Sequence, residues 1–101
     1  MHKGYYEAII QLRPATKELM RFIENRLKER ENVFISKIEE HKHGVDIYIS
    51  SQKYAQTIGR KLKKSFQGEL KLSRTLHTQD KMSGKKVYRL TVLFRLKPKE
   101  D

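Results

Sequence analysis

The sequence predicts one α+β domain of ferredoxin-like type, in which the order β-α-β-β-α-β is followed by an extra C-terminal strand. Three observations predict this fold. The apolar residues change repeatedly between the two-residue spacing of strands and the helical spacing of about 3.6 residues. The 101 residues, 37% of them hydrophobic, are enough for one modest core and too few for two. The strands alternate apolar and polar residues, which is typical of an antiparallel sheet with two helices on one face.

Each element begins and ends at a recognisable signal. Pro14 ends the first strand because it has no N–H for a sheet hydrogen bond, and Thr16 can cap the helix that follows. The turn His43-Gly44 joins a hairpin, and Gly68 follows the second helix as a stop. The expected elements are strand 5–13, a helix from Thr16 to about 30, strands 33–41 and 45–50, a helix from Ser50 or Ser51 to about 67, and strands 69–78 and 86–96. We expect residues 1–96 to form the domain and residues 97–101 a disordered tail.

The apolar positions of these elements predict the core. In the first strand, one face carries Tyr6, Ala8, Ile10 and Leu12, and in the last strand one face carries Tyr88, Leu90, Val92, Phe94 and Leu96. The helical stripes are Leu19, Phe22, Ile23 and Leu27 in the first helix, and Tyr54, Ala55, Ile58, Leu62 and Phe66 in the second.

Charge is distributed unevenly along the chain. Lys and Arg number 23 against 12 Asp and Glu, which gives a net charge of +11. Residues 1–50 carry nine cations and eight acids, whereas residues 51–101 carry fourteen cations and four acids. A balanced half joined to a strongly basic half indicates an anionic partner on one side of the molecule, and clustered basic charge is typical of nucleic-acid binding. The alternative is a cationic surface that keeps the protein soluble and has no partner.

The second helix is the strongest candidate for phosphate binding. No acid occurs between Ser51 and Gly68, so nothing on this helix offsets the repulsion among its cations. Its candidate residues are Lys53, Arg60 and Lys64, opposite the apolar stripe, and Lys61 and Lys63 beside them. The alternative is an ordinary solvated helix face.

The last hairpin continues this basic surface. Its candidate residues are Lys71, Arg74, Lys81, Lys85, Lys86, Arg89 and Arg95. The tip from Asp80 to Lys86 is expected to protrude beyond the sheet and could carry its lysines to phosphates. Lys and Arg also occur on edge strands simply because they discourage pairing with other chains, and a solvated mobile loop is the alternative for the tip.

Tyr5 and Tyr48 are candidates for stacking on RNA bases, because both are expected on the open face of the sheet. The motifs that would support this are incomplete. The stretch from Gly44 to Tyr48 lacks the aromatics that an RNA-recognition motif places after its Gly, and Ile58–Leu62 has Leu62 where a KH-domain loop needs its second Gly. Amphipathic tyrosines partly covered by their neighbours are the alternative.

Other classes of function have little support. The chain has no Cys, which excludes disulfides and Cys-based zinc sites, and it has no apolar stretch long enough to span a membrane. His41 and His43 share a strand face but are only two ligands, so no metal site is predicted. No catalytic constellation and no phosphate-cradling Gly loop occurs. We therefore predict no enzyme activity, no cofactor and no small-molecule substrate.

Three stretches resemble the central domain of the large-ribosomal-subunit export adapter (nonsense-mediated decay protein three) family. They are Tyr5–Arg13, the run Gly44–Ser51 with Tyr54-Ala55, and the closing hairpin from Leu76 to Val92. The resemblance covers most of residues 5–96. It implies a factor that binds the large ribosomal subunit, which in eukaryotes accompanies pre-ribosomes out of the nucleus and in archaea acts in assembly or translation. Family members carry an N-terminal region of paired-Cys zinc motifs, and this chain has no Cys. The resemblance therefore implies an archaeal-type member that is either an excised domain or a reduced relative, and the zinc and ribosome-docking roles of that region do not carry over.

The sequence therefore predicts a non-enzymatic, cytoplasmic, ribosome-associated RNA-binding domain. Its expected partners are ribosomal RNA of the large subunit and ribosomal proteins. The alternative is a protein-interaction module that docks an acidic partner through its basic face or an edge strand.

Overall fold

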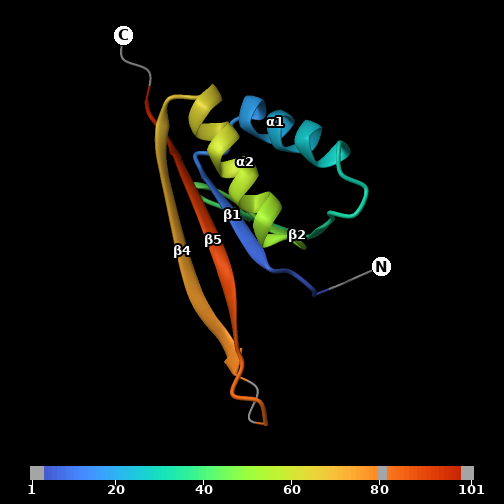
Figure 1. Cartoon of the computed structure of the whole chain (residues 1–101). Coiled ribbons are helices and arrows are strands. Elements are labelled where there is room, and N and C mark those ends of the chain that lie inside the picture. The colour runs from blue at the N-terminus through green and yellow to red at the C-terminus, as the bar shows by residue number, and fades with distance from the viewer. Residues whose placement is uncertain (1–3, 80–81, 99–101) are drawn as a thin grey trace.

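The fold consists of a five-stranded sheet with two helices on one face (Figure 1). A computed structural model describes residues 4–79 and 82–98. Its elements in chain order are β1 (Ala8–Arg13), α1 (Lys17–Lys28), β2 (Ile35–His41), β3 (Gly44–Ile49), α2 (Gln52–Ser65), β4 (Gly68–Gln79) and β5 (Lys86–Leu96). The predicted α+β class and the placement of both helices on one face are confirmed. The part of the predicted tail beyond Pro98 lies outside the described residues.

The sheet order differs from the predicted antiparallel ferredoxin-like sheet. The strands lie in the order β2-β3-β1-β5-β4, and β1 pairs with β5 in parallel while the other pairs are antiparallel. The prediction of a wholly antiparallel sheet was therefore wrong. The extra strand β5 does not extend the sheet but enters it between β1 and β4. The physical reason is burial. The apolar residues of β5 are removed from water only if β5 lies in the middle of the sheet, whereas the charged residues of β4 can remain exposed at its edge.

The helix ends follow the predicted caps. Thr16 Oγ1 accepts a hydrogen bond from the Leu19 N–H at 3.1 Å, and Ser51 Oγ accepts one from the Tyr54 N–H at 3.1 Å. The first strand is shorter than predicted and begins at Ala8 instead of Tyr5. Glu7 lies just before this strand, and its Oε1 accepts a hydrogen bond from the Gln52 N–H at 2.9 Å. This side chain therefore helps to fix the start of α2.

The core lies between the sheet and the helices. Its buried hydrophobic residues are Ala8, Ile10, Leu12, Leu19, Ile23, Ile47, Ile49, Tyr54, Ala55, Ile58, Leu62, Leu90, Val92 and Phe94. Most of the predicted apolar positions are among them, and Phe22, Leu27, Phe66 and Leu96 pack against this set while partly exposed. Gly59 brings α2 close to the sheet, since a Cβ there would lie 2.9 Å from Val92 Cγ1.

The β4–β5 hairpin extends beyond the ends of the helices and makes the molecule long and narrow, at 57 × 25 × 25 Å (Figure 1). Gln52 Nε2 donates to the Tyr88 carbonyl at 2.6 Å, which places the N-terminus of α2 beside Tyr88. Residues 75–79 and 82–88 therefore lie beyond the helices, and we call them the arm. Both faces of β4 are exposed from Lys71 to Thr78.

Candidate nucleic-acid interface

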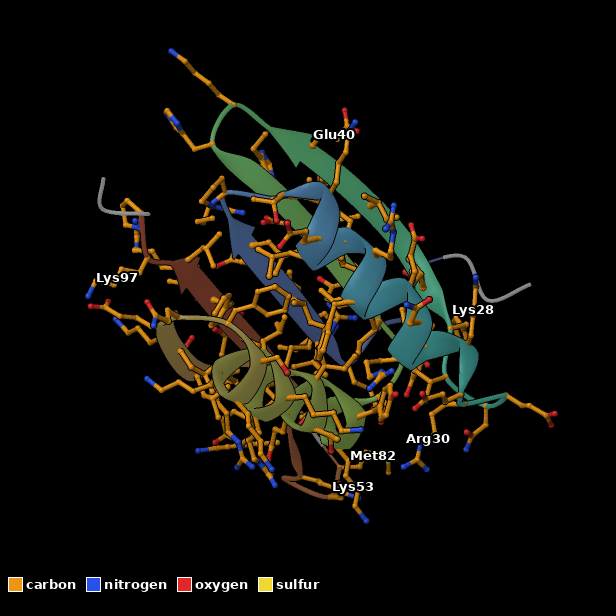
Figure 2. The ribbon with its side chains drawn as sticks, turned by 90° about the horizontal axis from the view of Figure 1, so that it is seen from above. Lys28, Arg30, Glu40, Lys53, Met82 and Lys97 are labelled. Carbon is orange, nitrogen blue, oxygen red and sulfur yellow. The ribbon has the colours of Figure 1, made fainter. Side chains whose placement is uncertain are left out.

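The outer side of α2 carries the five cations predicted from its sequence. Their apolar counterparts, including Ile58 and Leu62, are buried on the opposite side. Lys53, Arg60, Lys63 and Lys64 are exposed and Lys61 is partly exposed. Side chains ending in nitrogen gather along the side of the molecule formed by α2, away from α1 (Figure 2). Within residues 4–79 and 82–98, no carboxylate forms an ion pair with any of them, so their charge is available to an anion.

Two of these cations also make contacts within the domain. Lys63 Nζ donates to the Gly68 carbonyl at 3.4 Å, beside the C-terminal end of the helix, where a cation is favoured. Arg60 Nη2 donates to Gln56 Oε1 at 3.3 Å on the exposed surface. These contacts orient the two side chains without neutralising their charge.

The cations of the last hairpin are spread over different parts of the molecule. Strand register places Arg74 opposite Leu90, on the helix side of the sheet and next to the α2 surface. Lys71, opposite Leu93, lies on the uncovered face with Arg89 and Arg95, because alternate residues of a strand point to opposite faces. Lys85 and Lys86 are exposed in the arm. Lys81 lies outside the described residues.

The structure therefore joins α2 and Arg74 into one basic surface, which Lys85 and Lys86 extend along the arm. It does not bring Lys71, Arg89 and Arg95 to that surface. Alternation along the last strand indicated that Arg89 and Arg95 share a face, but only the strand register shows which face Arg74 and Lys71 occupy.

Two adjacent aromatic rings with a cation at each end form a row across the uncovered face of the sheet. The Arg89 guanidinium carbon lies 3.8 Å from the centre of the Tyr6 ring, and the Tyr6 and Tyr48 rings meet edge to face at 4.8 Å between centres. Lys37 Nζ lies 4.9 Å from the centre of the Tyr48 ring. Lys37 and Tyr6 are thus immediate neighbours of the Tyr48 ring and reduce the space for a base to stack on it.

The Tyr48 hydroxyl donates a hydrogen bond to Glu39 Oε1. This bond raises the pKa of Tyr48 to about 12 and lowers the pKa of Glu39, because it stabilises the neutral phenol and the ionised carboxylate together. Tyr48 is thus held in place by its hydroxyl as well as by its ring.

Tyr5 lies apart from this row. It precedes β1, is 50% exposed, and donates from its hydroxyl to Glu7 Oε2 at 2.6 Å, a bond that raises the pKa of Tyr5. Its ring centre is 6.4 Å from that of Phe34. Tyr6, which the two-residue period assigned to the core face, takes the place beside Tyr48 because the strand begins only at Ala8.

The sequence did not predict a cluster of charged side chains at the end of the sheet, formed by Arg13, Asp46 and His41. Arg13 Nη2 donates to Asp46 Oδ1 at 2.6 Å, and His41 Nε2 lies 3.1 Å from Asp46 Oδ2. Asp46 is buried, with 7% of its surface exposed. The signal for this cluster was a single acid in the apolar run of residues 45–49, since a buried carboxylate needs partners.

The family model described as NMD3, second domain, matches residues 5–96. This chain belongs to the NMD3 family. The match spans every strand and helix of the fold and confirms the predicted resemblance. The family is one of export adapters for the 60S ribosomal subunit, so the domain is ribosome-related at the level of its family. A search of curated proteins finds no match to the chain.

In this NMD3-family domain, the stretch from Gly44 to Ser51 that carried the resemblance becomes β3 and the N-cap of α2. This stretch therefore contributes both to the core and to the start of the basic helix. The closing hairpin of the resemblance becomes the outer part of β4, the arm and β5.

Among the residues that the structure describes, no three His, Asp or Glu side chains form a group that could hold a metal ion. His41 contacts Asp46, and His43 is exposed in the β2–β3 turn. The described helices include none that is long and apolar enough to cross a membrane.

Proposed function

We propose that this domain is a non-enzymatic RNA-binding module that contacts ribosomal RNA of the large subunit through α2, Arg74 and the arm. The observation that carries the proposal is the row of cations on α2, which has no ion-pair partner in the described part of the chain. Membership of a ribosome-related family supplies the context. The proposed place of action is the cytoplasm, in assembly of the subunit or in translation.

The dimensions of α2 suit a phosphate backbone. Lys53 and Lys64 are separated by about 16 Å along the helix axis at 1.5 Å per residue. This length spans several consecutive phosphates of a nucleic-acid strand. Such contacts position RNA without reading its sequence, so binding should differ little between sequences.

A salt titration with variants tests this proposal. The affinity for single-stranded RNA should fall with salt at a log–log slope near −3 to −4 for four or five phosphate contacts. Replacing Lys53, Arg60 and Lys64 together with Gln should weaken binding and reduce the slope by about 2, because three contacts are lost. Fluorescence anisotropy with two RNAs of unrelated sequence measures both quantities.

The matched control removes the same charge from the other helix, through Lys17→Gln, Arg21→Gln and Lys28→Gln. These positions are exposed on α1, and we expect RNA affinity to change only slightly. An equal loss from the control would contradict the assignment of the surface to α2.

A second candidate function rests on a different observation. The arm exposes apolar side chains, with Leu76 48%, Val87 44% and Tyr88 39% exposed. Exposed apolar residues beside lysines suit a protein partner with an acidic rim. Competition separates the two functions, since RNA binding predicts displacement by structured RNA and protein docking predicts displacement by an acidic polypeptide.

A further inference from the structure

A pocket of about 670 Å³ lies at the carboxyl ends of the parallel strands β1 and β5. Parallel register places Arg13 directly beside Arg95 at this end, and the β2–β3 turn forms another wall with Lys42 and His43. The arm begins at the other end of β5, so the pocket and the arm lie at opposite ends of the molecule. Pockets of this size are large enough for a small ligand, and ligands of open sheets commonly bind beyond the carboxyl ends of parallel strands.

The charged side chains that line the pocket are mostly basic. Arg13, Lys42 and Arg95 carry permanent positive charge, two histidines accompany them, and Glu40 is the one acid among the lining residues. Neither Lys42 nor Arg95 forms an ion pair with any described carboxylate. Their charge is therefore available to a bound anion.

Arg13 lines this pocket and is held by several hydrogen bonds. Its Nη1 donates to the Leu12 carbonyl at 2.9 Å and to the Val45 carbonyl at 3.2 Å, while Nη2 donates to Asp46. The space for this arrangement exists because Gly44 has no side chain, since a Cβ there would lie 2.8 Å from Arg13 Nη1. Asp46 does not line the pocket, so its charge lies behind Arg13 and His41.

We propose that this pocket binds a phosphate group, which Arg95 and Lys42 contact directly and Arg13 helps to orient. A guanidinium and an ammonium group that line one concave site can provide charge-assisted hydrogen bonds of the type that phosphates accept. The phosphate comes from an RNA strand or from a free anion such as inorganic phosphate. The RNA source rests on the proposed function, whereas the free anion does not.

The test uses the full chain with three probes: inorganic phosphate, a short single-stranded RNA with a 5′-phosphate, and the same RNA without it. Amide signals of residues 42–44 and 95 in heteronuclear NMR spectra report the site. We expect saturable shifts of these signals with a phosphate-bearing probe. Shifts with inorganic phosphate identify a free-anion site. Shifts with both RNAs identify a contact to the phosphates of the RNA backbone, and shifts with only the phosphorylated RNA identify a contact to its 5′-phosphate.

The controls include variants that are expected to weaken phosphate binding and one that is expected to tighten it. Lys42→Gln with Arg95→Gln should weaken phosphate binding at least tenfold, while Lys17→Gln with Arg21→Gln on α1 should leave it unchanged. Glu40→Gln should tighten binding, because it removes the one acid in the lining, and a variant that merely failed to fold could not produce this gain.

No shift of the pocket signals with any phosphate-bearing probe, or an equal loss in the α1 control, would overturn the proposal. The α2 variant with Lys53, Arg60 and Lys64 replaced by Gln separates the two proposals. If that variant binds RNA like the unmodified chain while inorganic phosphate still shifts the pocket signals, the proposed function fails and the phosphate site stands.

Discussion

The close packing of β1 against β3 at one end of the sheet depends on a single residue, Gly44. A Cβ at this residue would lie 1.9 Å from the Leu12 carbonyl oxygen and 2.8 Å from two atoms of the Arg13 side chain. The backbone of β1 thus approaches Gly44 more closely than any side chain permits. The Arg13–Asp46–His41 cluster depends on this approach, since Arg13 reaches Asp46 across the Gly44 backbone.

Gly44→Ala should destabilise the domain by about 3 kcal/mol, because the nearest atoms belong to backbone and cannot move aside without separating β1 from β3. Chemical denaturation followed by circular dichroism measures the free energy of unfolding. Gly84→Ala is the control, since its φ of +72° disfavours Ala but no atom lies within 4 Å of the added Cβ, so about 1 kcal/mol is expected. Equal losses for the two variants would show that crowding at Gly44 is relieved by movement.

At the scale of the element, α2 combines a structural side and a charged side. Its buried residues pack on β1, β4 and β5, and Gly59 permits close contact with Val92. Its cations all lie outside this contact, so removing their charge leaves the packing intact. The arm differs, because Gln52 contacts it only at the Tyr88 carbonyl and its described residues from 75 to 78 and from 82 to 88 are exposed to solvent.

Replacing Lys81, Lys85 and Lys86 with Ser should lower RNA affinity and change the free energy of unfolding by no more than about 0.5 kcal/mol, as is usual for surface positions. Lys85 and Lys86 are exposed, and Lys81 lies outside the described residues. Anisotropy titrations and thermal denaturation measure the two effects. The corresponding Arg variant keeps the charge and should keep the affinity. If the Ser variant bound RNA as well as the unmodified chain, the arm would not belong to the interface.

At the scale of the whole molecule, the stabilising contacts are concentrated in one part of a long body. The fully buried residues lie where the helices cover the sheet, while the described part of the arm has apolar residues that are 39–97% exposed. The domain can therefore lose contacts in the arm without losing its fold.

Two substitutions that shorten a side chain compare the core with the arm. Phe94→Ala removes a fully buried ring from β5 and should cost about 4 kcal/mol, whereas Leu76→Ala in the arm should cost about 1 kcal/mol or less because the side chain is 48% exposed. Denaturant titrations of both variants test the difference. Comparable losses would indicate that the arm contributes to the cooperative core.

Much of the fold could be predicted because its signals are local. The caps Thr16 and Ser51, the two helical stripes and the bounds of β5 depend on residues within a few positions of one another. The basic helix was found for the same reason, since its cations and its missing acids occupy one short segment. The pairing of Tyr6 with Tyr48 was missed because it depends on where β1 begins, and the two-residue period placed that start at Tyr5 instead of Ala8.

The sequence by itself determined the two helices, the strands, the buried stripes and the concentration of positive charge in the second half of the chain. Only the tertiary structure decided that β5 lies between β1 and β4, which brings Arg95 beside Arg13. The physical reason is that the spacing of apolar residues shows which side of an element meets the core, whereas any two strands can form backbone hydrogen bonds with each other. Which strands become neighbours depends on burial over the whole sheet. The proposed phosphate pocket depends on the resulting pairing of β1 with β5, which places Arg13 beside Arg95.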